Sequence, residues 1–100
     1  MSVILMGEFR LPAENLEAAR PAIDKVVSLT RAEEGCLHYA YAADLFDPCL
    51  IRISEKWSGP EALAAHMKAA HMDEWKQARE KLGMTGRTVT MYEVASEKAV

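Results

Sequence analysis

The order in which strand and helix patterns alternate constrains this 100-residue chain more than any other feature of its sequence. One strand pattern comes first, followed by a helical pattern, two strand patterns, a second helical pattern and a last strand pattern. Two strand–helix–strand units in this order predict a four-stranded antiparallel sheet with the helices on one face. The expected fold class is therefore α+β, in one domain over residues 1–95 that is followed by a loose C-terminal tail at residues 96–100.

Four segments are rich in β-branched, aromatic or alternating apolar residues, which is typical of strands. They cover residues 3–9, 36–43, 50–57 and 88–94. Residues 44–48 have the composition of a turn, so the second and third strands are expected to form a hairpin. Alternation along the third strand places Glu55 and Trp57 on the same face.

Helical periodicity begins at Ala13 and continues to Gly35, a residue type that commonly ends helices. A second helix is predicted over residues 61–82, with a break near Lys68 and a stop at Gly83. Ser58 is expected to cap this helix, because a glutamate three residues later completes a capping box.

The sheet face opposite the helices is expected to carry Leu50, Ile4 and Met6, and no remaining segment of the chain could cover it. A second copy could cover it with the same face of its own sheet. A domain of this size buries only a modest core, so association would also stabilise it. We therefore expect a homodimer in which sheet packs on sheet.

Charge and hydropathy exclude several classes of partner. The net charge of −3 gives no basic field, so nucleic acid is not expected as a partner. No apolar run approaches the roughly 20 residues that a membrane span needs, so no membrane is expected either. The apolar N-terminus is short and is followed by Glu8, unlike a signal peptide, which favours a cytoplasmic location.

The two cysteines, Cys36 and Cys49, are too few for a disulfide framework and form no C-x-x-C pair. The turn between their strands leaves them out of register for a bridge, whose geometry is narrow. Both are expected to be free thiols.

The histidines are candidate site residues. His66 and His71 lie five residues apart, which is about 140° around a continuous helix and not the spacing of a zinc-binding helical pair. No carboxylate or cysteine is expected to complete a ligand set, so no metal site is predicted. If the helix breaks near Lys68, both histidines face one pocket; otherwise one packs against the sheet and the other is solvated.

Aromatic residues of the sheet could line such a pocket. Trp57 shares a face with Glu55, and Tyr39 shares one with Tyr41. Core packing and cross-strand packing are the alternative roles of these side chains. There is no glycine-rich phosphate loop and no serine nucleophile elbow, so no nucleotide or flavin site is predicted.

Several short motifs together resemble the antibiotic biosynthesis monooxygenase family. They are Glu34-Gly35-Cys36-Leu37-x-Tyr39, Asp44-x-x-Asp47-Pro48, Glu55-Lys56-Trp57, Leu63-x-x-His66 and His71-Met72. The resemblance extends from Val3 to Val94 and implies a ferredoxin-like βαββαβ fold that pairs into a dimeric α+β barrel. Members of the family include quinol monooxygenases that use no cofactor, haem-degrading enzymes and an isomerase.

The haem-degrading branch is not expected here. Its members use an asparagine on the first strand and a tryptophan on the second helix, and this chain has Phe9 and His66 at these positions. His71 also falls earlier than the histidine of that branch. His66 and Trp57 match positions common to the broader family, including its quinol-oxidising members.

The resemblance implies a cofactor-independent monooxygenase that oxidises a small aromatic quinol or polyketide-like phenol with molecular oxygen. His66 is expected to be the catalytic base or orienter, with His71 second, because histidine titrates near neutral pH. The expected substrate-binding residues are Trp57, Tyr39, Glu55 and Phe9. The alternatives are a non-catalytic dimeric module that binds a small hydrophobic ligand, and an isomerase on the same fold.

Overall fold

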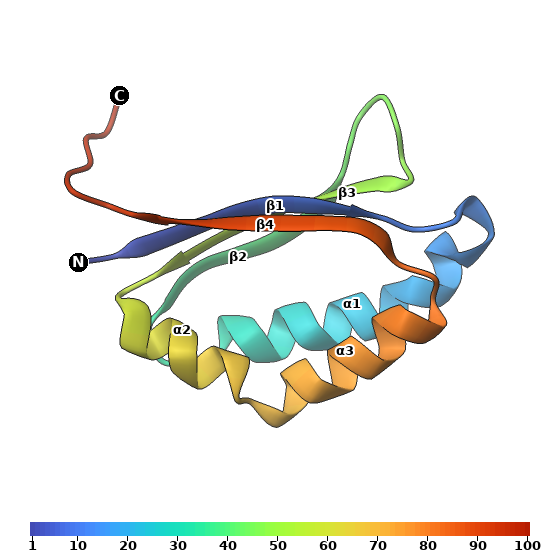
Figure 1. Cartoon of the computed structure of the whole chain (residues 1–100), viewed down its shortest axis with the longest axis horizontal. Helices are drawn as coiled ribbons and strands as arrows, with labels where there is room; N and C mark the ends of the chain where they lie inside the picture. Colours follow the sequence, from blue (N-terminus) through green and yellow to red (C-terminus); the bar gives the residue numbers. More distant parts are fainter.

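A four-stranded antiparallel sheet forms one layer of the molecule, and the helices form a second layer beneath it (Figure 1). The structure is a computed structural model that describes residues 1–100. The strands are β1 (Val3–Arg10), β2 (Cys36–Ala43), β3 (Leu50–Trp57) and β4 (Thr85–Glu93), and the helices are α1 (Leu16–Arg31), α2 (Pro60–Met67) and α3 (Ala70–Lys81). A 3₁₀ turn, η1 (Ala13–Asn15), precedes α1. The strand order is β2-β3-β1-β4, which confirms the predicted α+β ferredoxin-like fold.

Most predicted elements agree with the structure. The second helix is broken as predicted: α2 ends at Met67 and α3 begins at Ala70. The last strand begins at Thr85, three residues before the predicted start. The predicted capping box is wrong, because Gly59 is the N-cap and no side chain caps α2. The Ser58 N–H instead donates to the Gly35 carbonyl at 2.8 Å.

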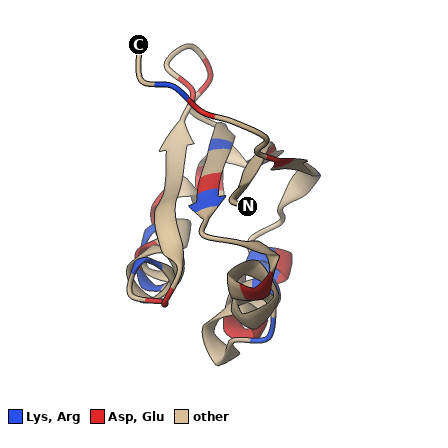
Figure 2. Ribbon diagram, turned by 90° about the vertical axis from the view of Figure 1, so that its left-hand side faces the viewer, with Lys and Arg blue, Asp and Glu red and all other residues tan.

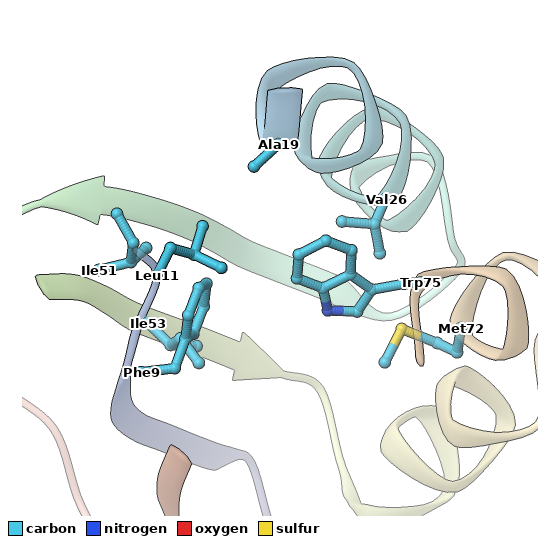
Figure 3. Packing of buried hydrophobic residues seen from close by; sticks show 8 residues of the cluster. All are labelled: Phe9, Leu11, Ala19, Val26, Ile51, Ile53, Met72 and Trp75. Carbon is cyan, nitrogen blue, oxygen red and sulfur yellow. The ribbon is translucent and has the colours of Figure 1, made fainter. Parts of the chain in front are cut away.

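The main core lies between the sheet and helices α1 and α3. Figure 3 shows Trp75 of α3 between Val26 of α1 and Phe9 of β1. The members of this cluster are Phe9, Leu11, Ala19, Val26, Ile51, Ile53, Met72 and Trp75. A second cluster of Val3, Tyr39 and Trp57 lies at the other end of the sheet, where α2 packs. The candidate site adjoins this second cluster.

The opposite face of the sheet is not covered by any helix (Figure 1). Met6 and Tyr92, on β1 and β4, remain 59% and 52% exposed. Charges of both signs are spread over the helices, as Figure 2 shows. Neither cysteine is bridged, which confirms the prediction of free thiols. No helix has the length and apolar character needed to cross a membrane.

Candidate functional site

The connection between α1 and β2 carries Glu33 and is held close to α2. Gly35 in this connection has φ +83°, a conformation that glycine adopts without strain. A Cβ built at Gly35 would lie 2.5 Å from the Ala62 Cβ and 2.7 Å from the Ser58 Oγ. The close approach that glycine permits therefore brings the Glu33 side chain beside the helices.

One oxygen of Glu33 contacts both candidate histidines. Glu33 Oε2 lies 2.7 Å from His66 Nδ1 and 2.8 Å from His71 Nε2. The break between α2 and α3 turns the two rings toward each other, with centroids 6.1 Å apart. The expectation that no carboxylate joins these histidines is wrong, because Glu33 reaches them from a segment more than thirty residues away.

His66 lies in an aromatic environment. His66 is only 1% exposed. The ring lies 4.6 Å from the Trp57 indole and 5.5 Å from the Tyr39 phenol, measured between centroids. His71 is less enclosed, with 15% of its side chain exposed. The structure therefore brings His66, His71, Trp57 and Tyr39 together.

Glu55 lies in the same region but contacts neither histidine by a hydrogen bond. Its Oε1 accepts from the Trp57 Nε1–H at 3.0 Å. Burial raises the pKa of the Glu55 carboxyl, and the hydrogen bond from Trp57, with smaller coulombic effects of His66 and Arg87, offsets this only in part. A carboxyl with a raised pKa can carry a proton closer to neutral pH than an exposed one.

The tyrosine pair links His66 to the main core. The hydroxyls of Tyr39 and Tyr41 lie 2.9 Å apart, and burial raises the pKa of both phenols. Tyr41 packs against Trp75, and the nearby Trp75 indole N–H favours the ionised Tyr41 phenol, which offsets part of the effect of burial on its pKa. This buried Nε1–H makes no hydrogen bond of regular geometry, which is uncommon for a buried donor.

Phe9, predicted to bind substrate, is a fully buried member of the main core. It is 0% exposed and lies edge-on to Tyr41, with ring centroids 5.6 Å apart. It also contacts the ring of Trp75. Phe9 therefore packs in the core beside Tyr41 and supports the tyrosine pair. His38 lies on the opposite face of the sheet, where its Nε2 is hydrogen-bonded to the Ser54 hydroxyl.

Glu33, His66 and His71 are the residues that could hold a metal ion, since their ligand atoms all lie within 4.8 Å of one another. The two nitrogen–oxygen distances of 2.7 and 2.8 Å are those of charge-assisted hydrogen bonds. If both ring nitrogens carry hydrogen, two hydrogen bonds to the carboxylate satisfy the same three groups that an ion would bridge.

The cavities reach the edges of this cluster but not His66. One cavity of about 410 Å³ lies between α1 and the β2–β3 hairpin and includes Tyr41 and Ile51 in its lining. Another, of about 380 Å³, includes Tyr39 and Cys36. A small hollow of about 50 Å³ between α1 and α3 includes His71 and Trp75. His66 lines none of the five main cavities, so its ring is enclosed by its neighbours in this conformation.

Sequence reasoning did not identify Glu33 as a site residue. A signal was present, because Glu33 and Glu34 follow a helix C-terminus, where negative charge is unfavourable. Such a pair at an unfavourable position indicates a role outside the helix. Only the tertiary structure shows that Glu33 turns inward while Glu34 stays exposed.

Comparisons with known proteins agree with this architecture. The family profile described as antibiotic biosynthesis monooxygenase matches residues 2–78. A candidate antibiotic biosynthesis monooxygenase from Deinococcus radiodurans is 28% identical, with a TM-score of 0.91 over 98% of this chain and 97% of that chain. No curated protein matches significantly.

Two further solved structures show the same fold. A conserved protein of unknown function from Bacteroides thetaiotaomicron, described as a possible oxidoreductase, is 26% identical, with a TM-score of 0.83 over 93% of this chain and 97% of that chain. Rv0793 from Mycobacterium tuberculosis is 21% identical, with a TM-score of 0.87 over 99% of this chain and 100% of that chain. The similarity thus extends over whole chains.

Proposed function

Because the chain belongs to the antibiotic biosynthesis monooxygenase family, we propose that it is a cofactor-independent monooxygenase. Its substrate is a small aromatic quinol or polyketide-like phenol, and its oxidant is molecular oxygen. The observation that carries this proposal is the enclosed His66 ring, which is bonded to Glu33 on one side and packed against Trp57 on the other.

The chemistry needs a base, an apolar enclosure and oxygen. His66 removes the phenolic proton, which leaves an electron-rich phenolate. The phenolate reduces oxygen and forms a carbon–oxygen bond. Loss of water then yields a quinone that retains one oxygen atom, so a phenol and O₂ give a quinone and water. The substrate supplies all the electrons, and no flavin, metal or external reductant is needed.

The surrounding side chains support binding of an aromatic phenol. Trp57 and Tyr39 offer faces and edges for ring contacts. The Trp75 N–H lies beside the Tyr41 hydroxyl without a hydrogen bond of regular geometry and could donate to a substrate oxygen. Phe9 packs edge-on against Tyr41 and holds it in place. Glu55, with its raised pKa, can hold a proton beside the substrate ring.

The enclosure of His66 implies that neighbouring side chains move when substrate enters. The α2–α3 junction at Lys68 and Ala69 lies next to the cluster and is held to α2 by bonds over three residues, Lys68 N–H to the Ala65 carbonyl and Ala69 N–H to the His66 carbonyl, instead of α-helical bonds. Movement at this junction would open the space between His66 and His71. We therefore propose that substrate enters beside the junction.

Oxygen uptake with a panel of quinols and phenols tests the proposal. The expected result is substrate-dependent consumption of O₂ in chelator-treated buffer, with one atom of ¹⁸O₂ in the quinone product. A stable folded protein that consumes oxygen with none of these compounds would instead support a non-catalytic binding module or an isomerase.

A further inference from the structure

A single carboxylate oxygen that faces two imidazoles fixes where their protons lie. A carboxylate oxygen only accepts hydrogen bonds, so the two ring nitrogens nearest to it must both carry hydrogen. These are His66 Nδ1 and His71 Nε2, at 2.7 and 2.8 Å. A neutral imidazole has one N–H, so the lone pair of His66 is then on Nε2.

No other group in the structure fixes the tautomer of His66. His66 Nε2 makes no hydrogen bond with any other residue, since the only polar contact of the ring is through Nδ1. The nearest alternative carboxylate, Glu55, is engaged by the Trp57 indole. Packing against Trp57 and Tyr39 restricts rotation of the ring. The tautomer and orientation of His66 therefore depend on Glu33.

We propose that Glu33 is a positioning residue of the monooxygenase reaction, which presents Nε2 of His66 as the proton-accepting atom and holds His71 beside it. This inference rests on the proposed function for its catalytic half. When His66 takes the substrate proton, the adjacent Glu33 carboxylate stabilises the imidazolium that forms. His71 donates to the same oxygen and keeps the carboxylate from rotating away.

Glu33 offers variants that separate its oxygen from its charge. Glu33→Gln keeps a carbonyl oxygen that can accept from both rings but removes the charge. Glu33→Met keeps the length of the side chain and removes the acceptor. Glu34 is exposed and adjacent, so Glu34→Met is the matched control.

Nitrogen-15 NMR of the imidazoles is the primary test, because it distinguishes a protonated ring nitrogen from one with a lone pair and needs no substrate. At about pH 8, where an unperturbed histidine is neutral, His66 should carry its proton on Nδ1 in the wild type, in Glu33→Gln and in Glu34→Met. Glu33→Met should lose this preference. A wild-type His66 protonated on Nε2 would overturn the inference.

Kinetics test the catalytic half. Misplaced catalytic groups commonly lose about 100-fold in rate, so Glu33→Met should lose turnover on that scale with KM changed little. Glu33→Gln should keep more turnover than Glu33→Met, and Glu34→Met should match the wild type. Wild-type turnover in Glu33→Met would overturn the positioning role. If no phenol is oxidised by the wild type, the proposed function fails, while the NMR result still decides the tautomer.

Discussion

The imidazole of His66 lies against the indole of Trp57, with ring centroids 4.6 Å apart and planes inclined by 34°. These residues come from α2 and β3, so the contact joins the helical layer to the sheet. The ring is thereby held between an apolar face and the Glu33 carboxylate. This combination is suited to a base that must act without water in its surroundings.

Replacing His66 should separate catalysis from packing. Glutamine keeps a donor for Glu33 and removes the titratable nitrogen. His66→Gln should lower turnover by roughly 10²–10⁴-fold with a nearly unchanged melting temperature, because acid–base groups contribute on that scale. Melting curves and oxygen uptake on the same variant are the measurements. Full activity in a stable variant would transfer the role to His71.

If His66 is only structural, the opposite pattern is expected. Loss of a buried partner costs about 1–3 kcal/mol, so the melting temperature would fall and activity would follow the folded fraction. His38→Gln, on the other face of the sheet and bonded to Ser54, is the control for a general effect of losing a histidine.

Glu55 should make stability depend on pH. Burial raises its pKa above 4.5, so the folded state binds more protons than the unfolded state and stability falls as pH rises through the raised pKa. Glu55→Gln cannot ionise, so this variant does not lose stability as pH rises in the way the wild type does, and it keeps an acceptor for the Trp57 N–H. Its melting temperature relative to wild type should therefore be higher at about pH 8 than at about pH 4, where both forms are largely uncharged. A difference that is the same at both pH values, measured beside Glu34→Gln, would contradict this prediction.

The uncovered sheet face leads us to predict a homodimer. Light scattering coupled to gel filtration should report about twice the chain mass of 11.1 kDa. Met6→Glu places a charge on the exposed face and should shift the mass toward the monomer, whereas Lys76→Glu on exposed α3 should not. A wild-type monomer at micromolar concentration would contradict the prediction.

We predict that activity requires no metal. Elemental analysis of protein purified without an affinity tag should find no stoichiometric zinc, iron or copper. Oxygen uptake should survive dialysis against a chelator. If a metal is found, its loss in Glu33→Gln and in His71→Ala would place it on the cluster that offers three ligand atoms.

The fold could be predicted because local patterns in the sequence agree with it. The alternation over residues 36–43 and 50–57 predicts both ends of β2 and of β3 correctly. The start of β4 was missed because Thr85, Gly86 and Arg87 carry no apolar side chain. Thr85 pairs with Arg10 of β1, and Gly86 and Arg87 lie at the register shift that follows this pair, which local apolar patterns do not reveal.

The site could be predicted only in part. His66 lies on an apolar helix stripe, and its burial follows from that pattern. The contact of His66 with Glu33 does not follow from the pattern, because Glu33 comes from a loop whose position depends on the close contact of Gly35 with α2. The predicted Ser58 cap failed for a related reason, since its backbone N–H is used to hold Gly35.

The strand order β2-β3-β1-β4 also sets a sequence of events during synthesis. Of the four strands β1 is translated first, but its partners are β3 and β4, so one edge of β1 stays open until β3 is made and the other until β4 is made. Open strand edges are where nascent chains aggregate. We therefore expect β1 to be the strand most dependent on chaperones, and the three-stranded sheet that lacks β4 to be the intermediate that they protect.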